Sequence, residues 1–296
     1  MKDWSDGFVA IDWGTTNRRA YLLDAAGVVV AEMEDDLGVT SVPAGGFERA
    51  VATIAERFGD KPMLLAGMIG SNRGWREAPY VRCPAGPAQL ARQLLWIEEG
   101  RIAIVPGLSI VSGRHADVMR GEEVQVFGLS RLGRGGGDAT ICHPGTHTKW
   151  VKLQAGQVVD FRTVMTGELF SLLCEHSILA PTLQGTVDPG EPFLAGVDAT
   201  WSGEALTAEL FAIRARVLLS LMDAQDAASY ASGLLIGCDL RAGLAAGEGK
   251  EIFIVGRPSL NRLYAAALER CGFTAREVDG AEAFVAGMQH IKESFA

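Results

Sequence analysis

The sequence predicts an α/β protein of two related halves, each a mixed β-sheet flanked by helices. Strand and helix patterns alternate after an opening strand meander, and a similar meander recurs at residues 139–165. The 296 residues also exceed the usual size of one domain. A Gly-rich stretch at residues 132–140 lies between the two meanders and is the natural linker. The predicted domains are therefore residues 1–132 and 133–296.

The first half begins with three predicted strands joined by short turns. Residues 8–13 form an apolar run broken only by Asp12, and "RAYLLD" and "VVVAEME" follow on either side of the turn signal "AAG". "FERAVATIAERF" then has apolar residues at helical spacing. The remaining elements are predicted as a buried strand in "KPMLLAGMIG", a helix in "AQLARQLLWIEEG", a strand in "RIAIVPGLSIV" and a helix in "EEVQVFGLSRLG".

The second half repeats the opening pattern. In "ATICHPGTHTKWVKLQAGQVVDFRTVM" an apolar strand runs into Gly145-Thr146, then a basic-aromatic strand, the turn "QAGQ" and a Val-rich strand. Laid over the opening, Gly145-Thr146 aligns with Gly14-Thr15 and Lys149 with Arg18, which indicates an internal duplication. The elements predicted after it are helices in "GELFSLLCEHSIL", "EALTAELFAIRARVLLSLMDA" and "AASYASGLLIGCDLRAGLAA", a strand in "EIFIVGRPSL", and helices in "NRLYAAALERCG" and "AEAFVAGMQHIKESF". Gly233 and Gly237 lie four apart and suit close helix packing.

Composition excludes several classes of protein. The net charge of -9 argues against a general nucleic-acid or membrane-surface binder, because both need a basic face. The five cysteines are odd in number and contain no CxxC pair, which indicates reduced thiols and no zinc site. The start lacks the apolar stretch of a signal peptide, and no apolar run approaches a membrane span. We expect a cytoplasmic protein, and base rates favour a homodimer.

The two Gly-Thr turns are the first candidate site. Gly14, Thr15 and Thr16 in one half and Gly145 and Thr146 in the other can present backbone N–H groups and hydroxyls to phosphate oxygens. One such turn alone is more often an ordinary hairpin. Two matched turns favour a phosphate clamp.

Charged residues beside these turns differ between the halves. Asp12 ends a buried strand, where it can hold Mg²⁺ directly or through water. The second half has His143 at the matching place, so metal binding is assigned to the first turn alone. Lys149 can supply a positive charge to the phosphates.

"HADVMRGEEVQVFG" is the second candidate site. Asp117 follows a strand-like segment and precedes a helix that starts near Gly121. It is either a cap or a general base beside the hydroxyl that it deprotonates. Glu122 lies in the first helical turn, and a structural or substrate-orienting role is favoured for it.

Two further stretches complete the pattern. The loop "AGMIGSNRGWREAPYVRCPAG" is rich in Gly, Pro and Arg, and at least one of Arg73, Arg76 and Arg82 is expected to bind a substrate carboxylate. "IVGRPSLNRL" places Gly256 at a strand end before a helix, which leaves room for a purine. Each of these has an ordinary structural reading when taken alone.

Together these stretches resemble the sugar-kinase, hexokinase, actin and Hsp70 superfamily. "DWGTTNRR" looks like its first phosphate motif, "PGTHTKW" like its second and "IVGRPSLN" like its adenosine motif. Asp117 stands at the place of the catalytic Asp of its sugar kinases. More narrowly, the chain is similar to the 2-dehydro-3-deoxygalactonokinase family. The phrases that carry this are "GMIGSNRGWREAPYVRCPA", "DVMRGEEVQVFG", "PGTHTKWVKL", "DFRTVMTGELFSLLCEHSIL" and "GRPSLNRLYAAAL".

The resemblance implies two RNase H-like (actin-like ATPase) domains with ATP and Mg²⁺ in a central cleft. It implies transfer of the γ-phosphoryl group to the 6-hydroxyl of 2-dehydro-3-deoxy-D-galactonate in galactonate catabolism. The implied catalytic residue is Asp117 and the metal ligand is Asp12. The implied nucleotide-binding residues are Gly14, Thr15, Thr16, Gly145, Thr146, Lys149, Gly256 and Arg257. The implied substrate-binding residues are Arg73, Trp75, Arg120, Glu122 and Glu168.

The chain departs from the superfamily pattern at two places. His143-Pro144 replaces the usual acidic start of the second phosphate motif, and Gly256 is followed by Arg257 where many relatives have two glycines. The alternatives are a kinase for the gluconate-derived epimer or another sugar acid, and a sugar-independent ATPase or polyphosphate hydrolase of the same fold.

Overall fold

Contacts divide the chain into two compact units. The computed structural model describes residues 4–244 and 249–295. Unit 1 comprises Met1–Asp138, Leu153–Phe161 and Gly280–Ala296, and unit 2 comprises Ala139–Lys152 and Arg162–Asp279. The sequence-based boundary between residues 132 and 133 stays a prediction. The division by contacts assigns the C-terminal segment to unit 1.

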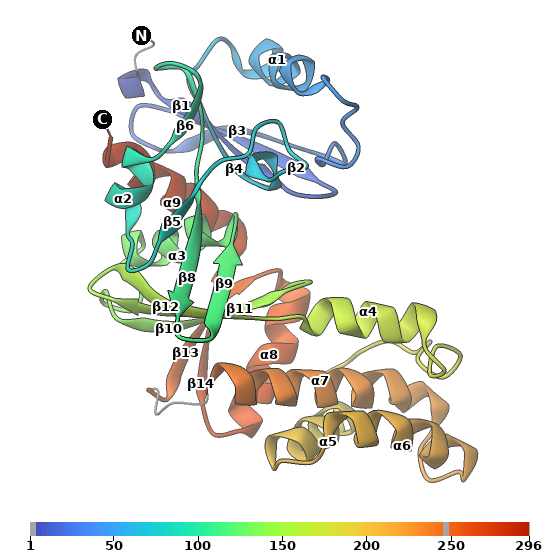
Figure 1. Ribbon diagram of the computed structural model, residues 1–296. Helices are drawn as coiled ribbons and strands as arrows, with labels where there is room; N and C mark the ends of the chain where they lie inside the picture. Colours follow the sequence, from blue (N-terminus) through green and yellow to red (C-terminus); the bar gives the residue numbers. More distant parts are fainter. Residues whose placement is uncertain (1–3, 245–248, 296) are drawn as a thin grey trace. The chain divides into compact units, whose positions relative to one another are not determined.

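Unit 1 is organised around a six-stranded sheet with the order β3-β2-β1-β4-β7-β6 (Figure 1). Its strands are β1 (Phe8–Trp13), β2 (Arg18–Leu23), β3 (Val29–Asp35), β4 (Met63–Gly67), β6 (Leu95–Glu98) and β7 (Ile102–Ile104). β1, β2 and β3 form an antiparallel meander, and β4 and β7 run parallel to β1. A three-stranded sheet with the order β5-β8-β9 contains β5 (Tyr80–Arg82), β8 (Gly107–Ser112) and β9 (His115–Met119).

The second large sheet has five strands in the order β12-β11-β10-β13-β14 and lies mainly in unit 2; contacts assign Leu153–Phe161, in β11 and β12, to unit 1. Its strands are β10 (Ala139–His143), β11 (Thr148–Gln154), β12 (Gln157–Val164), β13 (Glu251–Gly256) and β14 (Thr274–Asp279). β10, β13 and β14 are parallel, whereas the short loops between β10, β11 and β12 require antiparallel neighbours. Both sheets therefore place a meander beside two parallel strands, and the predicted duplication is confirmed.

The two predicted phosphate turns have equivalent places in these sheets. Residues 14–17 join the first and second strands of one sheet, and residues 144–147 join those of the other. Counted from the strand ends, Lys149 matches Arg19 and Gly145-Thr146 matches Thr15-Thr16, so the predicted alignment of the two turns was wrong by one residue.

The helices of unit 1 follow the apolar patterns of the sequence. They are α1 (Phe47–Phe58), α2 (Pro87–Arg92), α3 (Glu122–Arg131) and α9 (Gly280–Glu293), with short 3₁₀ turns at Trp4–Asp6 and Met68–Gly70. α1 buries Phe47, Ile54 and Phe58 against the core beside β1 and β4. α3 and α9 pack closely because Gly128 and Gly287 leave no side chain between them.

The helices of unit 2 are α4 (Thr166–His176), α5 (Glu191–Trp201), α6 (Leu206–Leu218), α7 (Ala227–Gly243) and α8 (Pro258–Arg270), with a 3₁₀ turn at Ala224–Asp226. α5 and α7 lie side by side (Figure 1). A Cβ on Gly233 would fall inside 3.0 Å of the Phe193 carbonyl, so the predicted role of this glycine in close packing is confirmed.

Several segments differ from the sequence-based expectation. The helix predicted in residues 88–100 ends at Arg92, and β6 follows it, because the apolar run "LLWI" continues the sheet beside β7. The strand predicted in residues 101–111 is two strands, interrupted at Pro106. α5 and β14 had no predicted counterpart, since "EPFLAGVDATW" and "TAREVD" lack clear periodicity.

None of the helices within residues 4–244 and 249–295 combines the length and the apolar character that crossing a membrane requires.

Candidate active site

The first Gly-Thr turn is held by its carbonyl oxygens. The segment after β3 donates three main-chain N–H groups to it: from Val39 to the Gly14 carbonyl, Gly38 to Thr16 and Thr40 to Thr15, at 3.0–3.2 Å. Thr15 and Thr16 are exposed, and their N–H groups have no acceptor among the described residues. The turn therefore presents donors outward, which suits an anion.

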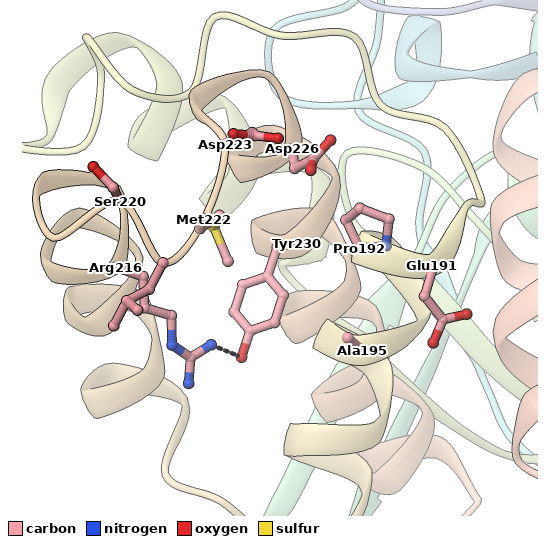
Figure 2. A pocket seen from close by; sticks show the side chains of 10 residues that line it. Glu191, Pro192, Ala195, Arg216, Ser220, Met222, Asp223, Asp226 and Tyr230 are labelled. Atoms are coloured by element: carbon pink, nitrogen blue, oxygen red, sulfur yellow. Dashed lines mark hydrogen bonds between the residues drawn. The ribbon is translucent and has the colours of Figure 1, made fainter.

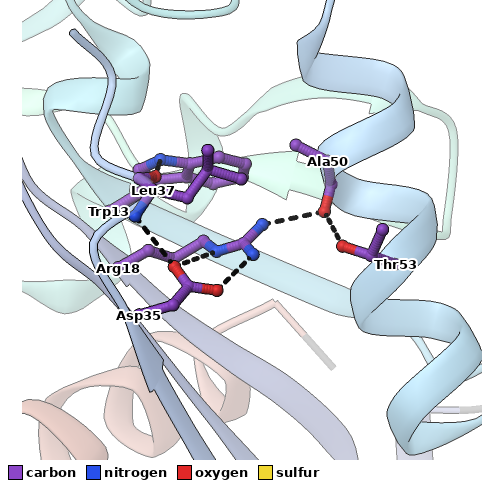
Figure 3. A network of polar contacts seen from close by, with 6 residues as sticks. All are labelled: Trp13, Arg18, Asp35, Leu37, Ala50 and Thr53. Atoms are coloured by element: carbon purple, nitrogen blue, oxygen red, sulfur yellow. Dashed lines mark hydrogen bonds and ion pairs between the residues drawn. The ribbon is translucent and has the colours of Figure 1, made fainter. Parts of the chain in front are cut away.

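Arg18 immediately follows this turn and points into the protein (Figure 3). It is 3% exposed, and its guanidinium lies 4.8 Å from the Trp13 ring centroid. It donates to the Asp35 carboxylate at 2.6 and 3.2 Å and to the Ala50 carbonyl at 2.8 Å. The Trp13 indole donates to the Leu37 carbonyl at 2.8 Å. Arg18 thus fixes the base of the turn and does not face a ligand.

Asp12 is half-buried in β1, and two glycines connect its surroundings to the start of α3. A Cβ built on Gly67 would lie 3.4 Å from an Asp12 carboxylate oxygen. A Cβ built on Gly121 would lie 3.1 Å from the Gly67 Cα. The structure therefore brings together Asp12 and the residues around Glu122.

The start of α3 carries two glutamates with different environments. The half-buried Glu122 carboxylate accepts the Arg120 N–H at 3.1 Å. Glu123 is fully buried and accepts the Gly121 N–H through both oxygens, at 2.7 and 2.9 Å. Burial, and then the neighbouring Glu122 carboxylate, raise the pKa of Glu123 to about 8.

The raised pKa of Glu123 predicts that stability falls as pH rises. Between its ordinary value of 4.5 and about 8, the folded protein retains a proton that the unfolded chain has lost. The contribution of Glu123 to the free energy of unfolding is complete below pH 4.5. It then falls by about 1.4 kcal/mol for each pH unit until pH 8. Urea unfolding of the wild type and Glu123→Gln between pH 5.5 and 8.5 measures this. If the free energy of unfolding fell equally steeply with pH in the two proteins, the prediction would be contradicted.

Asp117 lies inside β9, opposite Ile110 of β8. The expectation that it follows a strand was wrong, because β9 continues to Met119. Its side chain is half-buried and accepts the Val118 N–H at 2.8 Å. Its proposed role as a base stays a prediction.

The three arginines of the Arg-rich loop are exposed, and the one enclosed cation beside the loop is Arg120, which follows β9. Arg73 is exposed, whereas the half-buried Trp75 packs against the core. Arg120 lies 4.3 Å from the Tyr80 ring centroid and donates to the Ala78 carbonyl at 2.7 Å. Its Nε and Nη1 are buried without a hydrogen-bond partner within the described chain. Arg120 thus retains donors that match a carboxylate.

The second Gly-Thr turn is also held from its carbonyl side. The Glu168 N–H donates to the Thr146 carbonyl at 2.9 Å, and the Glu168 carboxylate lies 2.5 Å from Nε2 of His147. The N–H groups of Gly145 and Thr146 have no acceptor in the part of the chain that the structure describes. Lys149 is 5% exposed in β11, so its ammonium is largely enclosed.

The predicted adenosine segment lies beside this turn. A Cβ on Gly256 would be 3.5 Å from Pro144, and Arg257 is the exposed N-cap residue of α8. Asn261 is 2% exposed, and its Oδ1 has no hydrogen-bond partner among the described residues. The structure thus brings together Gly145, Thr146, Glu168 and Gly256 within unit 2.

Asp239 of α7 connects the elements around the second turn. It is fully buried, and its carboxylate accepts the Trp150 indole N–H at 2.7 Å and the Thr166 hydroxyl at 2.5 Å. It also accepts the Tyr264 hydroxyl. Burial raises the pKa of Asp239, opposed mainly by the Thr166 and Tyr264 hydrogen bonds. Sequence reasoning missed Asp239, although an aspartate inside an apolar helix was a visible signal.

A cavity of about 690 Å³ lies elsewhere, among α5, α6 and α7 (Figure 2). Arg216 and Tyr230, which are joined by a 2.5 Å hydrogen bond, line it together with Asp226. None of the predicted site residues lines this cavity. Its helices have little amphipathic pattern, and no sequence signal pointed to it.

The duplicated sheet order and the outward-facing Gly-Thr turn in each unit define a protein of the actin-like ATPase fold, which sugar kinases share. A family model described as 2-keto-3-deoxy-galactonokinase matches residues 12–291. The chain belongs to this family.

Named relatives agree over almost the whole chain. A probable 2-dehydro-3-deoxygalactonokinase of Rhizobium meliloti (strain 1021) is 37% identical over 300 residues, which cover 95% of each chain. The 2-dehydro-3-deoxygalactonokinase of Escherichia coli (strain K12) is 34% identical over 294 residues and 98% of each chain. The crystal structure of a protein of this kind from Sinorhizobium meliloti has a TM-score of 0.92 and 36% identity, covering 97% of this chain and 98% of that one.

Proposed function

We propose that the protein transfers the γ-phosphoryl group of ATP to the 6-hydroxyl of 2-dehydro-3-deoxy-D-galactonate, in galactonate catabolism. Family membership over residues 12–291 is the observation that carries this proposal. The two turns with outward N–H groups support it independently, because phosphoryl transfer depends chiefly on positioned donors around the phosphates.

The nucleotide is assigned to the two turns and the adenosine segment. Thr15 and Thr16 in unit 1 and Gly145 and Thr146 in unit 2 donate to phosphate oxygens. Gly14, whose N–H donates to the Asn17 carbonyl at 2.9 Å, lets a phosphate approach the turn backbone. Lys149 contributes positive charge near the second turn. Gly256 and Arg257 adjoin the adenosine, and the proximity of Gly256 to Pro144 supports a shared role for these two segments.

Asp12 is the proposed ligand for Mg²⁺. Its carboxylate oxygens are the donors that Mg²⁺ prefers, and Mg²⁺ commonly keeps waters and binds through one or two carboxylates plus phosphates. The described residues contain no group of three or more His, Cys, Asp or Glu side chains placed to hold a metal. A site that uses one carboxylate fits that arrangement. The ion would offset negative charge on the phosphates.

The sugar acid is assigned to unit 1. Arg73, Trp75, Arg120 and Glu122 surround it in this proposal, and Asp117 accepts the proton of the attacking hydroxyl. The buried, unpartnered nitrogens of Arg120 support a carboxylate ligand in this region. Glu168 was also predicted to bind the sugar acid. Its contact with His147 supports a role beside the second turn instead.

A coupled assay of ATP consumption tests the function. Strong stimulation by 2-dehydro-3-deoxy-D-galactonate, with little from the gluconate-derived epimer, is expected. Equal stimulation by the epimer would reassign the substrate. Consumption that does not depend on a sugar acid would support the ATPase or polyphosphate hydrolase alternative.

Gly145→Ala is expected to weaken ATP binding about tenfold without loss of stability. The nearest atoms to a Cβ on Gly145 are 3.9 Å away, so the free protein accommodates a methyl group there. A phosphate that approaches the turn backbone leaves no room for that methyl group. Calorimetric titration with a nonhydrolysable ATP analogue, together with thermal unfolding, measures both effects.

Gly190→Ala is the matched control in the same unit. Gly190 also has a negative φ, of -81°, and its nearest neighbour is 3.8 Å from a built Cβ. This variant should bind the analogue as the wild type does. Unchanged binding in Gly145→Ala would exclude a close phosphate contact at that turn.

A further inference from the structure

Each Gly-Thr turn is backed by a glycine at the same place in the two repeats. Gly38 is the third residue after β3, which ends at Asp35, and Gly167 is the third residue after β12, which ends at Val164. In both units this segment returns from the third strand of the meander to the turn between the first two.

Both glycines touch the main chain of the turn. A Cβ on Gly38 would fall inside 3.0 Å of the Thr15 carbonyl, and a Cβ on Gly167 inside 3.0 Å of the Gly145 carbonyl. Neither glycine has a positive φ. The requirement for glycine is therefore the close approach of two backbones, and an alanine at either place must displace the turn.

The two segments that carry these glycines, residues 37–40 and 166–168, are called the backing segments. They also determine which side of each turn remains open. Donors from residues 38–40 occupy the carbonyl oxygens of the first turn, and the Glu168 N–H occupies the Thr146 carbonyl of the second. The carbonyl side of each turn thus faces the backing segment. The N–H groups of Thr15 and Thr16 in the first turn and of Gly145 and Thr146 in the second are left for an anion.

Neither backing segment can easily retreat from its turn. Beside Gly38, the Leu37 carbonyl accepts the Trp13 indole N–H at 2.8 Å and the Thr40 hydroxyl donates to the Thr15 carbonyl at 2.8 Å. Beside Gly167, the Thr166 hydroxyl is bound at 2.5 Å by the fully buried Asp239. An added methyl group is therefore expected to move the exposed turn and leave the anchored segment in place.

We propose that Gly38 and Gly167 are paired positioning residues that set the two turns so that their N–H groups face the phosphates of a nucleotide. The pairing rests on the proposed function, because it assumes that both turns bind phosphate. It adds two residues to the binding machinery that touch no ligand themselves.

Gly38→Ala and Gly167→Ala are expected to raise KM for ATP about 10–100-fold, because small displacements of positioned groups have effects of that size. Nucleotide affinity, measured by titration with a nonhydrolysable ATP analogue, should fall in parallel. Amide hydrogen exchange without ligand should increase at residues 14–17 in the first variant and at residues 144–147 in the second.

The matched controls are Gly→Ala variants in which the added methyl group meets a main-chain carbonyl far from either turn. Gly287→Ala in unit 1 and Gly196→Ala in unit 2 each bring a Cβ inside 3.0 Å of a carbonyl in a helix contact, also without a positive φ. These variants should lower the melting temperature and leave KM for ATP unchanged. Wild-type KM for ATP in Gly38→Ala and Gly167→Ala, with unchanged exchange at their turns, would overturn the proposal.

Two variants that add no bulk test the proposal if Gly38→Ala or Gly167→Ala does not fold. Thr40→Val and Thr166→Val each remove one anchor of a backing segment. A higher KM for ATP and faster exchange at the corresponding turn support the proposal, and no change in either contradicts it. If the wild type binds no nucleotide, the proposed function fails, whereas the exchange measurements still test the positioning of the turns.

Discussion

Asp117→Asn is expected to lower phosphoryl transfer by about 10²–10⁴-fold and to keep nucleotide affinity. The amide cannot accept the proton of the 6-hydroxyl, but it retains the size of the carboxylate and its hydrogen bond from Val118. Single-turnover kinetics with 2-dehydro-3-deoxy-D-galactonate, together with titration of a nonhydrolysable ATP analogue, separates chemistry from binding.

Glu122→Gln is the informative comparison for this variant. Glu122 begins α3 next to Gly121, which touches Gly67 near Asp12, whereas Asp117 lies five residues earlier in β9. We expect Glu122→Gln to change KM for the sugar acid more than the rate of transfer. Near-normal transfer in Asp117→Asn, with loss in Glu122→Gln, would move the base to Glu122.

Much of the fold follows from local sequence. The meander strands and the helices α1, α8 and α9 have clear apolar patterns, and the repeated pattern at residues 139–165 is enough to indicate the duplication. Residues 88–100 show the limit of this reasoning. Their apolar run fits a helix or a strand equally well, and its pairing with β7, a long-range contact, decides the outcome.

The site was predictable at its turns and less so around them. Gly14-Thr15 and Gly145-Thr146 were visible because their residue types match the proposed phosphate contacts. Gly38 and Gly167 were not, since each is defined by its distance from a strand end and by the backbone that it touches. The orientation of the Arg18 side chain could not be predicted either, because it depends on packing against Trp13 and pairing with Asp35.

Asp12→Asn is expected to lower turnover at least about 100-fold at a fixed Mg²⁺ concentration, because a carboxylate that holds the ion contributes several kcal/mol to charge stabilisation. The half-buried position of Asp12 at the end of β1 suits this role, and the second turn has no carboxylate at the matching place. Turnover measured against Mg²⁺ concentration should show a higher half-saturating concentration in the variant.

Asp24→Asn is the matched control for Asp12. Asp24 lies at the other end of the same meander, where its carboxylate accepts the Ala26 and Val28 N–H groups at 2.9 Å. It shares the charge of Asp12 but not its neighbourhood, so its loss should leave the Mg²⁺ dependence unchanged. If Asp12→Asn retained the wild-type Mg²⁺ dependence as well, Asp12 would not be the metal ligand. The Glu34 hydrogen bond raises the pKa of Arg19 and burial raises the pKa of Tyr21, and a smaller contribution to both would then be the remaining role of Asp12.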